Sequence, residues 1–223
     1  MRVALEAPGI LVVDEVLPPD AFAALSADVS HADYRSVHSR RWDRAWRLWD
    51  GSPLRGASVW FDPEGRRPGE SPHYPTGTAV DRLFESIREL AGAHPGIAGS
   101  EGSDWVAMFL APWLYPVGSA LSLHHDAGTY SGAFTFFTHA RWRIHWGGEL
   151  MVFDAAPAEP QSARVSEEDE PEPPSGIATC VFPRPNRLAL LGPDRPHMIR
   201  RVDTNAGAHV RASLAGFFLR PEP

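Results

Sequence analysis

The pattern of apolar and polar positions divides the chain into a helical first part and a second part of short strands. Apolar residues run almost continuously over 10–17, which predicts a strand, and a helix is expected from about Asp20 to residue 30. In 79–91 the apolar residues recur at helical spacing, which predicts a second amphipathic helix. The preceding segment 62–77 is rich in Pro and Gly and is expected to be a loop.

From Trp105 onward the sequence consists of short apolar or alternating runs separated by Gly, Pro and Asp. This pattern predicts about eight strands, as in a barrel or jelly roll. The expected strands are 105–111, 119–124, 132–138, 148–153, 177–182, 187–191, 197–202 and 209–219.

The whole chain, 1–223, is expected to be a single domain of mainly β class with flanking helices (α+β). About 1–104 would form a helical support, and about 105–219 would form the β core. The acidic, Pro-rich segment of about 155–175 has no periodicity and is interpreted as a mobile surface loop.

Composition narrows the class of protein. The net charge of −7 argues against a nucleic-acid partner, which normally meets a basic surface. Cys180 is the only cysteine, so the chain cannot form an internal disulfide, and we expect a small buried side chain in a reducing compartment. We find no leader-like segment and no apolar run near the ~18 residues that a spanning helix needs, so the expectation is a cytoplasmic protein without a membrane partner.

The first candidate chemistry is a His-x-Asp pair with a distant histidine. In a strand, residues i and i+2 point to the same face, so His124 and Asp126 can enter a barrel together while His125 points away. His197 opens another expected strand and can supply a third ligand. Two imidazoles and one carboxylate on one side of a metal are typical of non-haem iron(II) oxygenases.

A cation follows the third candidate ligand. Arg211 lies 14 residues after His197, and Ser213 shares its face of the last expected strand. A guanidinium can hold a carboxylate through two parallel hydrogen bonds, and a hydroxyl can add a third. The alternative is an ordinary surface arginine beside the turn-forming segment 203–207.

Other candidates are weaker. Three tryptophans in 42–49 fall at i, i+4 and i+7 among several arginines. They are typical of a helix packed on a sheet with a solvated basic face, and the alternative is a lid that attracts an anionic substrate. His139, His145 and His209 are read first as structural or surface histidines. The candidate substrate residues are Arg44, Trp46, His145 and Trp146.

Four segments between 105 and 219 carry a resemblance to a known family. They are Tyr115-Pro116-Val117-Gly118 before His124-x-Asp126, Trp142 with Trp146-Gly147-Gly148-Glu149-Leu150, Asn186–Leu191 before Pro196-His197, and Arg211-Ala212-Ser213-Leu214. Together they resemble the iron(II)- and 2-oxoglutarate-dependent dioxygenases, most closely the prolyl-4-hydroxylase-like branch.

The resemblance implies a double-stranded β-helix (jelly roll, cupin-like), with the N-terminal helices packed on one sheet. It implies Fe(II), 2-oxoglutarate and O2 as cofactors, with ascorbate as a supporting reductant. The branch often has Lys where this chain has Arg211, and a second aromatic residue where Leu121 stands. The implied roles are iron binding by His124, Asp126 and His197, and binding of the 2-oxoglutarate carboxylate by Arg211, Ser213 and Tyr115.

The expected reaction is hydroxylation of an unactivated C–H bond, with decarboxylation of 2-oxoglutarate to succinate. The favoured substrate is a small molecule, either an amino acid or a natural-product intermediate, and dehydrogenation or ring formation are related outcomes. A peptidyl-prolyl or protein hydroxylase is the alternative. A cupin-like metal-binding isomerase without O2 chemistry and a non-catalytic binding module stay open, as do the monomer and the homodimer.

Overall fold

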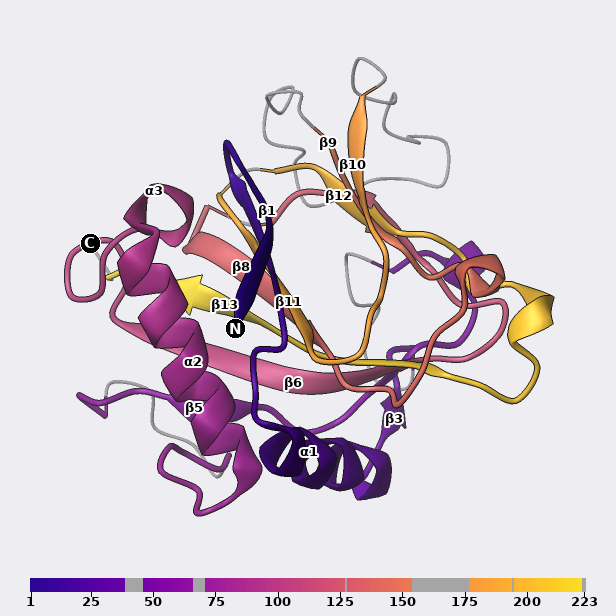
Figure 1. Cartoon of the computed structure of the whole chain (residues 1–223), viewed down its shortest axis with the longest axis horizontal. Helices are drawn as coiled ribbons and strands as arrows, with labels where there is room; N and C mark the ends of the chain where they lie inside the picture. The colour runs from indigo at the N-terminus through magenta and orange to yellow at the C-terminus, as the bar shows by residue number, and fades with distance from the viewer. Residues whose placement is uncertain (39–45, 66–70, 127, 154–176, 194, 222–223) are drawn as a thin grey trace.

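The computed structural model describes residues 1–38, 46–65, 71–126, 128–153, 177–193 and 195–221. The strands form two antiparallel sheets (Figure 1). The large sheet contains, in spatial order, β1 (Arg2–Ala7), β2 (Ile10–Asp14), β11 (Arg187–Leu191), β8 (Tyr130–Phe137), β13 (Arg211–Leu219), β6 (Ala107–Tyr115), β4 (Leu54–Arg55) and β3 (Arg35–Ser36), with β5 (Val59–Phe61) also paired to β6. The small sheet has the order β10 (Ala178–Val181), β9 (Leu150–Phe153), β12 (His197–Ile199) and β7 (Leu121–His124).

Helices cover the outer face of the large sheet. The helices α1 (Pro19–His31), α2 (Ala79–Ala93) and α3 (Pro95–Ala98) pack their apolar residues against it (Figure 1). In α2 the residues Leu83, Phe84 and Ile87 are fully buried at the helical spacing that the sequence shows. The helix begins where the Thr78 hydroxyl accepts a hydrogen bond from the backbone N–H of Val80.

The inner face of the large sheet packs against the small sheet. Alternate residues of each strand point to opposite faces, so each strand contributes to two cores. On β13, Leu214 and Phe218 join the core under the helices. On β6, Trp113 and Tyr115 belong to the second core, which lies between the two sheets. Functional side chains on the inner face are therefore separated from the helical layer by the sheet itself.

The predicted fold class is confirmed: the chain is mainly β, with a jelly-roll core and helices packed on one sheet. Each of the eight expected strands is present, some with shifted ends, and both expected helices form. The strands β1, β3, β4 and β5 were not predicted. Where the tryptophan spacing in 42–49 suggested a helix, the described part forms an extended segment and a single 3-10 turn, η1 (Leu48–Asp50).

The prediction for Cys180 is wrong, because its side chain is exposed. It lies on β10, the edge strand of the small sheet, and alternation turns it outward. The expected loop at about 155–175 lies outside the described residues. Within the described ranges, no helix is long and apolar enough to cross a membrane.

Candidate functional site

A β-bulge brings His124 to the inner side of the small sheet. β7 pairs with β12 so that His124 lies opposite His197 and Leu121 lies opposite Ile199. Three residue steps on β7 therefore match two steps on β12, and one extra residue is accommodated in β7. Both Leu121 and Ile199 belong to the inner core, so the bulge lets two residues of opposite parity face inward.

The three predicted metal ligands converge. One possible ligand atom from each of His124, Asp126 and His197 lies within 4.8 Å of the other two. The Nε2 atom of His124 is 3.9 Å from Oδ1 of Asp126, and the two imidazole rings are 4.3 Å apart between centroids. The route differs from the expected one, because β7 ends at His124 and Asp126 lies in the segment after it.

Backbone carbonyls fix which nitrogen of each histidine is free. Nδ1 of His124 donates to the carbonyl of Ser122 at 2.9 Å, and Nδ1 of His197 donates to the carbonyl of Arg195 at 2.8 Å. A carbonyl only accepts, so Nδ1 carries a hydrogen in each ring, and the lone pair of a neutral ring is on Nε2. Burial, and then the neighbouring His197, lower the pKa of His124 to about 3, so this ring is neutral at physiological pH. Two imidazoles that can present Nε2, together with a carboxylate, form a donor set that suits iron(II).

A buried carboxylate far away in sequence supports the bulge. The side chain of Asp50 accepts hydrogen bonds from the backbone N–H of Ser122 at 3.1 Å and from its hydroxyl at 2.9 Å. It also accepts from the backbone N–H of Arg47 at 2.8 Å, and only 1% of Asp50 is exposed. Because the carbonyl of Ser122 orients His124, Asp50 positions a candidate metal ligand through one intermediate residue. The sequence analysis missed it, and in the sequence nothing distinguishes it from an ordinary turn residue.

Arg211 is a fully buried cation on the inner face. Its Nε donates to the carbonyl of Gly148 at 2.7 Å, and its Nη1 donates to the hydroxyl of Ser213 at 3.2 Å. The rings of Tyr115 and Phe137 lie 5.1 and 4.9 Å from the guanidinium carbon. Its Nη2 is buried and has no hydrogen-bond partner among the described residues. The alternative interpretation of Arg211 as an ordinary surface arginine is therefore wrong.

Arg211 remains charged despite its burial. Desolvation lowers its pKa to about 10, and Tyr115 and Glu149 act in the opposite direction. Across the described ranges it forms no salt bridge with a carboxylate. Burying a charge without a counter-ion costs several kcal/mol, so this environment favours an anion that Nη2 can bind. Gly148 leaves room for the guanidinium, because a Cβ there would lie 2.9 Å from Cδ of Arg211.

The structure places the weaker candidates in different surroundings. Trp46 is buried and stacks on Trp113 at 4.7 Å, inside the core between the sheets. Trp146 is also buried, whereas His145 is exposed in the 3-10 turn η2 (Ile144–Trp146). Arg44 lies outside the described residues. A role for any of them in substrate binding stays a prediction.

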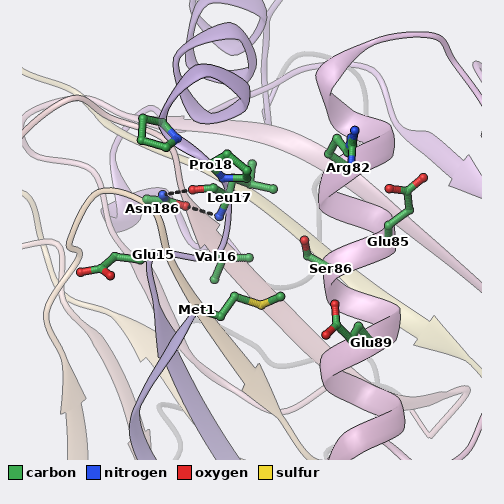
Figure 2. A pocket seen from close by; sticks show the side chains of 11 residues that line it. Met1, Glu15, Val16, Leu17, Pro18, Arg82, Glu85, Ser86, Glu89 and Asn186 are labelled. Atoms are coloured by element: carbon green, nitrogen blue, oxygen red, sulfur yellow. Dashed lines mark hydrogen bonds between the residues drawn. The ribbon is translucent and has the colours of Figure 1, made fainter.

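A groove of about 630 Å³ lies away from these residues (Figure 2). Its lining comes mainly from the segment after β2 and from α2, and no residue of the candidate site contributes to it. Figure 2 shows the side chain of Asn186 bonded to both backbone groups of Leu17, at 2.9 and 2.8 Å. These two hydrogen bonds connect the residue before β11 to the segment that leads into α1. The groove therefore belongs to the outer, structural side of the sheet.

Comparison with known proteins identifies the fold. No protein-family model matches the chain, and no curated protein matches its sequence. Among solved structures, a prolyl-4-hydroxylase of Pseudomonas putida is 20% identical, with a TM-score of 0.62 over 96% of this chain and 94% of that one. A Trichoplax adhaerens prolyl hydroxylase, solved with a hypoxia-inducible-factor peptide, is 13% identical, with a TM-score of 0.63 over 96% of this chain and 84% of that one.

A third similar structure performs a different reaction. The non-haem α-ketoglutarate-dependent epimerase SnoN from nogalamycin biosynthesis is 15% identical, with a TM-score of 0.53 over 96% of this chain and 78% of that one. The chain thus has the jelly-roll fold that 2-oxoglutarate-dependent non-haem iron enzymes share. That fold carries both prolyl hydroxylases and an epimerase, so the substrate must be argued from the site.

Proposed function

We propose that the chain is an iron(II)- and 2-oxoglutarate-dependent oxygenase, similar to the prolyl-4-hydroxylases, that hydroxylates a C–H bond of a small molecule. Iron would be held by His124, Asp126 and His197. The distal carboxylate of 2-oxoglutarate would be held by Arg211, assisted by the hydroxyl of Ser213 and the ring of Tyr115. Bound iron supplies activation of O2, and the balance is substrate, O2 and 2-oxoglutarate giving hydroxylated substrate, succinate and CO2.

One observation carries this proposal. Arg211 is fully buried and charged, and its Nη2 has no partner among the described residues. A bound carboxylate provides both the missing acceptor and the missing counter-charge. A cupin-like isomerase would need the same metal ligands, and in it Arg211 would hold the substrate instead of a co-substrate. Both histidines use Nδ1 to donate to a backbone carbonyl and so leave Nε2 for a ligand, which supports a metal rather than a hydrolytic dyad.

Turnover of the co-substrate tests the proposal. Purified protein with Fe(II) is expected to convert 2-oxoglutarate to succinate, and His197→Ala is expected to abolish this. Arg211→Met should raise the KM for 2-oxoglutarate at least tenfold, and Arg211→Lys should recover part of the loss because it keeps the charge. Arg82→Met, at an exposed arginine in the groove of Figure 2, is the matched control. Wild-type turnover by His197→Ala would refute the proposal.

Anaerobic titration separates the isomerase alternative. A 2-oxo acid chelated to iron(II) gives a weak visible charge-transfer band, which we expect here. A protein hydroxylase stays the second candidate, since two prolyl hydroxylases share the fold. Incubation with amino acids, prolyl peptides and ring-containing small molecules, followed by a search for a gain of one oxygen atom in mass, decides among the substrates.

A further inference from the structure

Four partly exposed aromatic rings gather at one end of the inner face of the large sheet. Trp60 on β5 lies opposite Phe109 on β6, and Phe109 lies opposite Phe217 on β13. Ring centroids are 4.8 Å apart for the first pair and 5.4 Å for the second. Tyr130 at the start of β8 stacks on Phe217 at 4.2 Å with an angle of 20° between the rings. We call these four residues the aromatic row.

The aromatic row shares its face with the proposed co-substrate site. On β13, Arg211 and Phe217 are six residues apart, an even number that puts both on the inner face, about 20 Å apart at about 3.3 Å per residue. Between them lies the small residue Ala215, opposite Ala111 of β6. The small sheet, which carries the metal ligands, packs against this same face. The guanidinium and the aromatic row thus lie toward opposite ends of β13, with Ser213 and Ala215 between them and the rings of Trp113 and Phe137 beside Ser213.

The rings of the aromatic row are more exposed than the aromatic rings on the outer face of the same sheet. Phe134, Phe136 and Phe218, which point toward the helices, are at most 1% exposed. The four rings of the row are only partly buried, although they touch one another. Trp60, Phe109 and Phe217 bear no charge, so they offer no ion-pair partner to an ammonium or carboxylate group. They do offer adjacent flat surfaces, and an aromatic pair adds about 0.5–1.5 kcal/mol beyond the area it buries.

We propose that the aromatic row binds an uncharged, flat aromatic ring of the small-molecule substrate. A substrate ring seated there would lie about 20 Å from Arg211 along β13, where it does not compete with 2-oxoglutarate for the guanidinium. This inference rests on the proposed function for its catalytic meaning, and it narrows the substrate class. A ring-bearing natural-product intermediate fits the row, whereas a small aliphatic amino acid leaves it uncovered.

Binding of a neutral two-ring probe tests the inference without iron or 2-oxoglutarate. The probes are 2-naphthol and its saturated counterpart decahydro-2-naphthol, each titrated into the full chain by calorimetry, with saturation-transfer NMR to confirm the contact. We expect the wild type to bind 2-naphthol more tightly than the saturated compound. Phe217→Leu keeps an apolar side chain but removes the ring. It should lower the affinity for 2-naphthol about 3- to 10-fold and change the affinity for the saturated probe less than twofold.

A matched control is available at Ile144, a 71% exposed apolar residue outside the row. Ile144→Ala should leave both affinities unchanged. Equal binding of the two probes, unchanged 2-naphthol affinity in Phe217→Leu, or tighter binding of tetramethylammonium than of 2-naphthol would each overturn the inference. The last result would indicate a cation site formed by the rings instead.

The failure of this inference is distinguishable from failure of the proposed function. Succinate formation reports on the metal ligands and Arg211, and 2-naphthol binding reports on the row alone. Succinate production without ring binding overturns only the substrate class. Ring binding by a protein that never decarboxylates 2-oxoglutarate supports the row as a binding site and removes the oxygenase assignment.

Discussion

Asp50→Ala is the perturbation whose effect follows most directly from the structure. It removes a buried carboxylate that accepts three hydrogen bonds, at 2.8 Å from Arg47 and at 3.1 and 2.9 Å from Ser122. Hydrogen bonds to charged groups contribute about 1.5–3 kcal/mol each, but they are not additive and the wild type already bears the cost of a buried charge. We expect the free energy of unfolding of the metal-free protein to fall by about 3–5 kcal/mol.

The same substitution should weaken the metal site. Without Asp50, the N–H and hydroxyl of Ser122 lose their acceptor, and the bulge that turns His124 inward is free to relax. Groups that orient metal ligands typically change affinity about 10- to 100-fold when removed. Asp50→Asn retains the shape and one acceptor oxygen, so its affinity should lie between that of Asp50→Ala and that of the wild type.

Two measurements separate positioning from mere stability. Co(II) affinity is followed by visible absorbance, and unfolding of the metal-free protein is followed in denaturant. Trp49→Phe is the control, because it keeps an aromatic ring and removes the exposed hydrogen bond from Nε1 to the Ser122 hydroxyl at 3.1 Å. It should change Co(II) affinity less than twofold. If Asp50→Ala unfolds more easily but still binds Co(II) within twofold of the wild type, the positioning argument is refuted.

Three further predictions concern other residues. Gly148→Ala should raise the KM for 2-oxoglutarate about tenfold in steady-state kinetics and change kcat less, because the added Cβ would lie 2.9 Å from Cδ of Arg211 at a φ of +74°. Burial raises the pKa of Asp14, but its hydrogen bond and ion pair with Arg187 outweigh this and hold the pKa below 3.8. Asp14→Asn should therefore cost about 2 kcal/mol of unfolding free energy at pH 7 and progressively less as the pH falls below 3.8, where the wild type also gains the proton; an equal cost at pH 3 would contradict the pairing. Partial burial and a nearby carboxylate raise the pKa of the Cys180 thiol, so iodoacetamide should label it at pH 7 more slowly than glutathione, as mass spectrometry would show.

The predictable part of the fold is the part with a clear period. The apolar residues of α2 and the eight later strands were predicted because each buries one face against a core. The missed strands lack that signal for physical reasons. β1 is an edge strand, mostly exposed or half-buried, and β3 and β4 have two residues each, so none of them shows a periodic burial pattern.

The candidate site likewise has residues that the sequence could indicate and features that it could not. His124, Asp126 and His197 could be proposed because few residue types bind metals, and their order and spacing are informative by themselves. The bulge that makes them converge could not, because it is a property of strand register and not of residue type. Asp50 meets Ser122 across 72 residues, mainly through backbone and hydroxyl donors that no sequence pattern marks.

The buried guanidinium shows how far register alone can change the meaning of a residue. In the sequence, Arg211 follows a turn-forming segment, and the sequence alone is compatible with an exposed arginine. Pairing of β13 with both β6 and β8 places it, fully buried, beside the rings of Tyr115 and Phe137. The cost of a buried charge without a counter-ion then favours an anion site, independently of any resemblance. For this reason Arg211→Lys is the most informative single variant of the proposed co-substrate site. Retained 2-oxoglutarate turnover would show that charge is the requirement, and complete loss would show that the paired hydrogen bonds of a guanidinium are required.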